Sequence, residues 1–245
     1  MTFLFYITDL KARGSRKMVT ALSADSDLLN IQQEEPVLIE LIKSKYLKFP
    51  KTSKDHDDKK YASNINIVFN DMTNGKFIEV GASGDIGTTE ILVESLNWTG
   101  LVVEPHPDTY MEIKNLRNVH TANICISPTH YPKQASFKSS KGHIKITCFP
   151  LYSVMVAFES TMLDLLKLNL KEADYQVLKT LPWNKVCIQV ISVPVNSKDI
   201  TMVTKLLENH GYQLNELIKN TDHYYFSNTQ RCLSSIKFVK NVNIL

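Results

Sequence analysis

One stretch of the chain, residues 76–104, constrains the fold more than any other. An apolar run over residues 77–80 is followed by closely spaced glycines, a segment with helical spacing of apolar residues, and a second apolar run that ends at Glu104. Glycines between a strand and a helix let the backbone adopt positive φ and approach a ligand closely. An acid after the second strand can accept hydrogen bonds from ribose hydroxyls. The stretch therefore predicts strand, glycine turn, helix and strand, with a nucleotide-type site at the turn.

The glycine spacing is Gly81-x-x-Gly84-x-x-Gly87, which differs from the dinucleotide-binding pattern Gly-x-Gly-x-x-Gly. An ordinary tight turn with a surface acid is therefore an alternative interpretation of the same residues. Glu104 followed by Pro105 favours the ligand-binding interpretation.

Apolar runs and helical patterns alternate along the rest of the chain, which predicts an α/β fold with a mostly parallel sheet. An inserted hairpin interrupts the alternation, and a second hairpin gives the sheet an antiparallel C-terminal end. We expect helices at 36–47, 107–116, 173–181 and 199–210, strands at 119–126, 163–170 and 186–193, and hairpins at 134–149 and 212–226.

Composition and charge divide the chain into three parts. A stretch of lysines and aspartates at residues 48–60 has almost nothing to bury, so we predict a linker there and a folded core that begins near residue 65. The expected units are an N-terminal extension with one docked helix (1–64), a main domain (65–228) and a C-terminal tail (229–245). The net charge of +3 is too small to indicate a nucleic-acid partner.

Targeting and metal-binding signals are weak. We find no apolar run of the roughly 20 residues that a membrane span needs and no signal-peptide pattern, so a lumenal and a cytoplasmic location both stay open. The four cysteines lack Cys-x-x-Cys spacing, and the histidines are scattered, so no metal site is predicted.

Two motifs are more specific than the order of elements. Phe-Ile-Glu-Val-Gly-Ala at 77–82 and Asn-Trp-Thr-Gly-Leu-Val-Val-Glu-Pro-His-Pro at 97–107 resemble the FkbM group of methyltransferase domains. Residues 123–128, 148–153 and 177–183 are similar to the arthropod Star-like branch of that group. The resemblance runs from about residue 65 to 226 and implies a Rossmann-like, S-adenosylmethionine-dependent methyltransferase fold.

The resemblance also implies a cofactor site at the glycine turn. It would place the methionine part of S-adenosylmethionine against residues 81–84 and the ribose hydroxyls on the acid after the second strand. The implied cofactor-binding residues are Glu79, Gly81, Ala82, Ser83, Gly84, Asp85, Glu104 and Pro105. In this chain Gly84 precedes Asp85, whereas the family has Asp-Gly, and the inversion moves both the carboxylate and the flexible point by one residue.

The fourth strand departs further from the family pattern, which has two acids and a glycine there. Asn169 replaces the first acid, Lys171 the second, and Glu172 the glycine, while Asp174 is retained on the following helix. Methyl transfer to oxygen needs a placed base or a metal, and acids at this strand end are the natural candidates. The Lys171 cation would also repel the positive sulfonium of the cofactor.

Two hypotheses from different classes follow. The first is a degenerate methyltransferase-fold domain that acts as a non-catalytic binding or regulatory module, with a protein partner that the sequence does not identify. The second is an active S-adenosylmethionine-dependent O-methyltransferase whose acceptor is an unknown small molecule or glycan. The Star-like segments, whose domain faces an oxidising lumen, also imply a possible disulfide between Cys125 and Cys148; the alternative is two buried free thiols.

Overall fold

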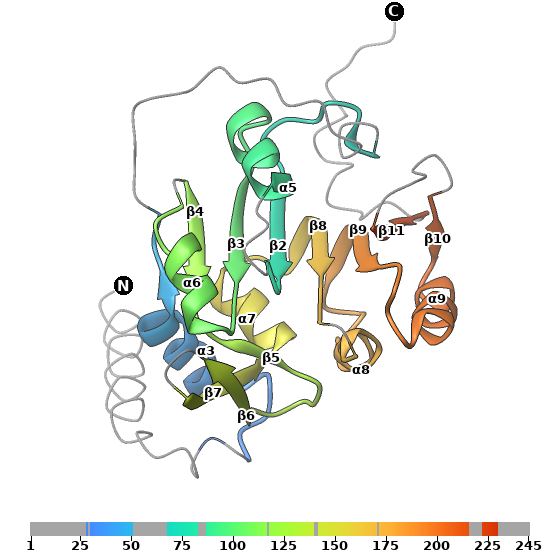
Figure 1. The fold of residues 1–245 in the computed structure, drawn as a ribbon. Coiled ribbons are helices and arrows are strands. Elements are labelled where there is room, and N and C mark those ends of the chain that lie inside the picture. Colours follow the sequence, from blue (N-terminus) through green and yellow to red (C-terminus); the bar gives the residue numbers. More distant parts are fainter. Residues whose placement is uncertain are drawn as a thin grey trace, which may run out of the picture.

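The computed structural model of the chain describes residues 28, 30–50, 68–82, 87–116, 118–139, 142–170, 172–215 and 222–229. Within these residues the chain forms an eight-stranded sheet with helices on both faces and a separate three-stranded sheet beside it (Figure 1). The predicted α/β class is therefore confirmed.

The large sheet is parallel at its centre and antiparallel at both edges. β4, β3, β2, β8 and β9 run parallel to one another, whereas β1 pairs antiparallel with β4 and β11 antiparallel with β9. The spatial order is β1 (Leu47–Lys48), β4 (Val119–Ala122), β3 (Thr99–Val103), β2 (Lys76–Val80), β8 (Met162–Leu168), β9 (Cys187–Pro194), β11 (His223–Asn228) and β10 (Tyr212–Leu214). The predicted C-terminal hairpin is the antiparallel pair β10–β11.

Side-chain alternation along the central strands divides the core into two clusters, one on each face of the sheet. Ile78 and Val80 of β2 belong to one cluster, and Phe77 belongs to the other. The first cluster contains residues of α3 (Pro36–Leu41), the π-helical turn η1 (Ile42–Tyr46), α7 (Leu151–Ala157), α8 (Asp174–Lys179) and α9 (Ile200–Asn209). The second contains residues of the π-helical turn η2 (Ile91–Ser95), which follows α5 (Gly87–Glu90), and of α6 (Pro107–Ile113).

The small sheet contains the hairpin predicted around residue 142. β6 (Lys133–Ser139) pairs antiparallel with β7 (Gly142–Pro150), and β7 also pairs parallel with β5 (Cys125–Ser127). The hairpin thus folds back beside the strand from which it emerged. This places it next to the carboxyl ends of the central strands of the large sheet (Figure 1).

Three sequence expectations need correction. The strand predicted at 119–126 is two strands in different sheets, because the chain turns at Asn123, whose side-chain Nδ2 donates to the carbonyl oxygens of Glu104 at 2.8 Å and Pro105 at 3.1 Å. Lys48, assigned to the linker, belongs to the edge strand β1. Helix α7 was not predicted, because most of its residues are buried and leave no polar face to reveal the helical period.

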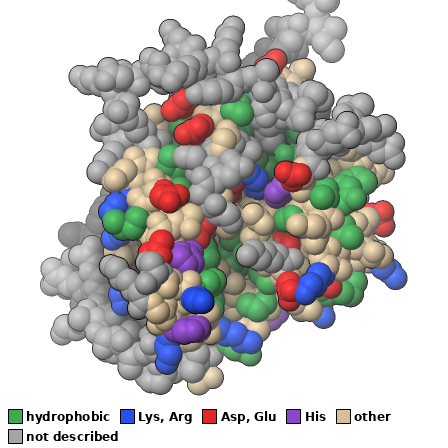
Figure 2. Space-filling view, viewed as in Figure 1, with side chains coloured by type: hydrophobic (Ala, Val, Ile, Leu, Met, Phe, Trp, Pro, Cys, Tyr) green, Lys and Arg blue, Asp and Glu red, His purple; other side chains and the backbone are tan. Residues whose placement is uncertain are grey.

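Charged side chains are mixed over much of the face shown in Figure 2, as a small net charge would suggest. Lys and His side chains gather in the lower part of that view, where Figure 1 places β6 and β7. No helix among the described residues is long and apolar enough to cross a membrane.

Candidate functional site

A cavity of about 470 Å³ lies at the carboxyl ends of β2, β3 and β8. The chain leaves β2 toward β3 on one side and returns as β8 on the other, so β2 marks the topological switch point at which open α/β sheets bind ligands. The lining residues come from the strand ends, the start of α6 and the small sheet: Val80, Gly81, Glu104, Pro105, His106, Thr109, Cys125, Ile126, Pro128, Ala135, Phe137, Cys148, Asn169, Leu170 and Ala173.

Gly81, which directly follows β2, lines the cavity. Its φ is 76°, in the left-handed region, and its N–H donates to the carbonyl oxygen of Val103 at 2.8 Å. A Cβ at this position would overlap the backbone carbonyl oxygen of Asn169. Two independent requirements, conformation and space, therefore call for glycine here.

The acid after β3 lies in the cavity wall but already has partners. Glu104 is 3% exposed, and its Oε1 accepts a hydrogen bond from the backbone N–H of His106 at 2.8 Å. The imidazole of His106 makes its own contact with the small sheet, because Nε2 donates to the carbonyl oxygen of Lys138 at 2.9 Å. Since a carbonyl can only accept, Nε2 carries a proton in this contact, and in the neutral imidazole Nδ1 is then an acceptor. Nδ1 is buried and has no hydrogen-bond partner among the described residues.

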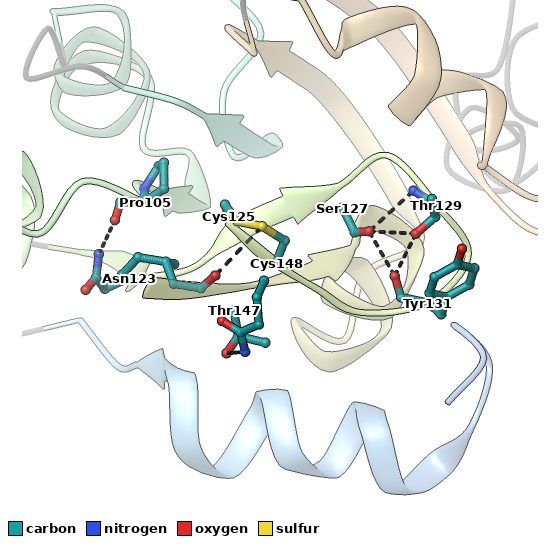
Figure 3. The surroundings of a disulfide bond; sticks show 10 residues. Pro105, Asn123, Cys125, Ser127, Thr129, Tyr131, Thr147 and Cys148 are labelled. Carbon is teal, nitrogen blue, oxygen red and sulfur yellow. Dashed lines mark hydrogen bonds between the residues drawn. A yellow bond between two sulfur atoms is a disulfide. The ribbon is translucent and has the colours of Figure 1, made fainter. Parts of the chain in front are cut away.

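A disulfide joins Cys125 of β5 to Cys148 of β7, and both residues line the cavity. The two cysteines are register partners in the parallel β5–β7 pair, with Cα atoms 4.2 Å apart. Figure 3 shows the bond between the two strands, with Asn123 reaching Pro105 on one side of it. Cys125 and Cys148 are therefore not free thiols in this structure. Cys187 is also disulfide-bonded.

The end of β8 presents no carboxylate to the cavity among the described residues. Asn169, Leu170 and Ala173 line it, whereas Asp174 does not. Asp174 is fully buried at the start of α8, where its Oδ1 accepts from the N–H of Leu170 at 3.0 Å and so holds the loop after β8. Burial raises the pKa of Asp174, opposed by the hydrogen bond from Leu170 and by smaller favourable contacts. Glu172 is exposed and paired with Lys198, and Lys171 lies outside the described residues.

Glu79, one of the implied cofactor-binding residues, does not line the cavity and lies on the opposite face of β2 from Val80. Its carboxylate is 3% exposed, pairs with the Lys167 ammonium at 2.8 Å, and accepts a hydrogen bond from the Thr89 hydroxyl. Glu79 and Lys167 are direct register partners across β2 and β8. Sequence reasoning missed Lys167 because it lies within an apolar run, and only the strand register brings it to Glu79.

The remaining expected cofactor residues differ in where they lie. Pro105 lines the cavity, whereas Ala82 is buried in the second core cluster. Ser83, Gly84 and Asp85 lie outside the described residues, so the cofactor-binding role expected of them stays a prediction. The described residues contain no group of three or more His, Cys, Asp or Glu side chains that could hold a metal ion.

No protein-family model matches the chain, and no curated protein sequence matches it. Several solved structures are similar at low identity. The precorrin-6y C5,15-methyltransferase of Geobacter metallireducens is 13% identical with a TM-score of 0.39, over 72% of this chain and 91% of that chain. A methyltransferase of Pyrococcus furiosus is 10% identical with a TM-score of 0.39, over 77% and 92%. The fibrillarin of Aeropyrum pernix, in complex with S-adenosyl-L-methionine, is 10% identical with a TM-score of 0.40, over 64% and 66%.

TM-scores of this size carry no argument of their own, so the fold is assigned from the order of the strands. In chain order the parallel strands are β2, β3, β4, β8 and β9. Across the sheet their order is β4, β3, β2, β8 and β9, so the first three strands run outward on one side and the last two on the other. The final antiparallel strand β11 then inserts between β9 and β10. The chain therefore has an α/β, Rossmann-like fold, with a mostly parallel sheet whose strand order reverses at β2.

Proposed function

We propose that this chain is an FkbM-type, Star-like methyltransferase-fold domain that binds a nucleoside-type ligand and does not transfer a methyl group from it. One observation carries the proposal: the cavity reaches the end of β8, and the described residues that line it there are Asn169, Leu170 and Ala173. None of these can take a proton from an acceptor hydroxyl. The nearby acid Asp174 is buried and bonded to Leu170 N.

The cavity suits S-adenosylmethionine as the ligand. Its volume of about 470 Å³ lies within the usual range for small-molecule sites. Glu104 would accept the ribose hydroxyls, the backbone at Gly81 leaves the ligand room to approach, and the apolar side chains of Ile126 and Phe137 would cover a nucleobase. When bound, the cofactor would supply an activated methyl group.

A second candidate, an active O-methyltransferase, is favoured by one specific observation. Nδ1 of His106 has no hydrogen-bond partner among the described residues, and the His106 side chain lines the same cavity. Neutral imidazole can act as a general base. In that candidate His106 takes the proton of the acceptor hydroxyl while Nε2–H stays on the Lys138 carbonyl oxygen.

Calorimetric titration with S-adenosylmethionine tests the ligand. We expect binding by the wild-type protein and at least tenfold weaker binding by Glu104→Gln, because a hydrogen bond to a charged group contributes about 1.5–3 kcal/mol. Glu172→Gln is the matched control, since Glu172 is an exposed carboxylate outside the cavity. No binding by the wild-type protein up to about 1 mM would refute the proposed ligand.

Methyl transfer is tested separately, with labelled S-adenosylmethionine and an extract of the native source as the pool of acceptors. The proposal predicts equal incorporation of label with the wild-type protein and with Glu104→Gln. Incorporation that requires Glu104 would refute the non-catalytic role. Its further loss in His106→Gln, with cofactor binding kept, would establish the second candidate.

A further inference from the structure

The inserted hairpin has two chemically different faces. Its register pairs Lys138 with His143 and Ser136 with Lys145. Because successive residues of a strand point to opposite faces, these four side chains share the outer face, and all four are exposed. The inner face contains Ala135, Phe137 and Cys148, which line the cavity.

The outer face is cationic and has no acidic neighbour in sequence. Between Glu112 and Glu159 the chain contains neither Asp nor Glu. Lys138 and Lys145 are diagonal neighbours across the pair, which places the two residues about 7–8 Å apart. In the part of the chain that the structure describes, no carboxylate forms an ion pair with either lysine. Figure 2 shows the Lys and His side chains gathered in this region.

The cationic side chains lie on a hairpin that is held in place at both ends. The base of the hairpin is tied to β5 by the disulfide between Cys125 and Cys148. Near the other end, the backbone carbonyl of Lys138 accepts the hydrogen bond from His106 Nε2. A surface that is already ordered loses little conformational entropy when it binds a partner. The positive charges on this surface favour a partner that is anionic.

We propose that the outer face of the β6–β7 hairpin, formed by Ser136, Lys138, His143 and Lys145, binds a sulfated polysaccharide chain. Ammonium groups donate strong, charge-assisted hydrogen bonds to oxyanions, and a repeating polyanion matches a strip of cations. A single-stranded nucleic acid fits less well, because the outer face has no Phe, Tyr or Trp side chain and offers bases only the imidazole of His143 to stack on. The disulfides favour an oxidising compartment, where sulfated glycans are the available polyanions. This site is separate from the cavity and independent of any nucleoside ligand.

Titration with a size-defined heparin oligosaccharide at several NaCl concentrations tests the site. The wild-type protein should bind it, and the affinity should fall as salt rises because both partners are charged. The double variant Lys138→Gln with Lys145→Gln should bind at least about tenfold more weakly at 0.15 M NaCl, since it loses two charged contacts. Both residues are exposed and side-chain changes leave the Lys138 carbonyl in place, so folding should be retained, as circular dichroism can check.

The control variant Lys179→Gln with Lys205→Gln has the same net charge as the double variant. Its changes lie on exposed positions of α8 and α9. Unchanged binding in this control, with weaker binding in the hairpin variant, would establish the site. The proposal is overturned by absent wild-type binding, by equal losses in the two variants, or by equal affinity for desulfated heparin. Tighter binding to a DNA duplex of similar charge would likewise overturn it.

Discussion

The disulfide between Cys125 and Cys148 offers the most quantitative test of this structure. The cysteines are 23 residues apart in sequence. By the chain-entropy relation, closing such a loop stabilises the folded state by about 3 kcal/mol at 25 °C. For a domain of this size that corresponds to a fall in Tm of about 10 °C when the bond is removed. Substitution by alanine is preferable to a reductant, because Cys187 is also disulfide-bonded and would be affected by reduction.

Three variants form a thermodynamic cycle: Cys125→Ala, Cys148→Ala and the double variant. One bond needs both sulfurs, so each single variant should lose about as much stability as the double, measured by urea unfolding without reductant. Alkylation followed by mass spectrometry reports the free thiol left in each single variant. If instead the two single effects add to give the double effect, the cysteines act as independent buried thiols, and the role assigned to the bond is refuted.

Other residues of the strand ends give further predictions. Gly81→Ala should destabilise the protein by at least about 2 kcal/mol in urea unfolding, because it adds a Cβ against Asn169 at a left-handed φ; a smaller loss would mean that the turn can adjust. Glu79→Ala should cost about 3–5 kcal/mol by leaving the Lys167 ammonium without this partner, and Glu79→Ala with Lys167→Met should recover part of the loss. Burial raises the pKa of Asp174 in the folded state, so the unfolded chain releases this proton at a lower pH than the folded chain does. The free energy of unfolding therefore falls as pH rises from about 3.8 through the folded pKa. Asp174→Asn removes that fall, and the Tm of the variant relative to wild type should therefore increase across this window; a difference that does not change with pH would contradict the assignment.

The core of the fold could be predicted because its strands are buried on both faces. Such strands appear as largely apolar runs, and the run before Gly81, which Glu79 interrupts, and the run before Glu104 became β2 and β3. Helix α9 ends at Asn209, close to the predicted end at residue 210, and Gly211 just beyond it adopts a φ of 82°. These features depend on local sequence alone.

What could not be predicted depends on contacts between distant segments. The edge strand that contains Lys48 is two residues long and has one buried side chain, so no alternation could reveal it. The split at Asn123 depends on carbonyl groups some twenty residues away in sequence. The pairing of Glu79 with Lys167 depends on the strand register. In the candidate site, the cavity residues of the hairpin could be expected only in general terms, because which face of a strand is inward depends on how the hairpin docks.

The hairpin separates the two proposals physically. Alternate residues of β6 and β7 face the cavity, and the residues between them face outward, so an outward Lys138→Gln leaves Phe137 and Cys148 in place. Glycan binding should therefore weaken in the Lys138→Gln with Lys145→Gln variant without a change in nucleoside affinity. Glu104→Gln should weaken nucleoside binding and leave glycan binding unchanged. Loss of the disulfide should affect both sites, because it removes a covalent tie on the strand that they share. Titration of the Cys125→Ala variant with each ligand measures this: weakening of both supports a common platform, whereas weakening of neither would mean that the ladder between β6 and β7 orders the hairpin without the bond.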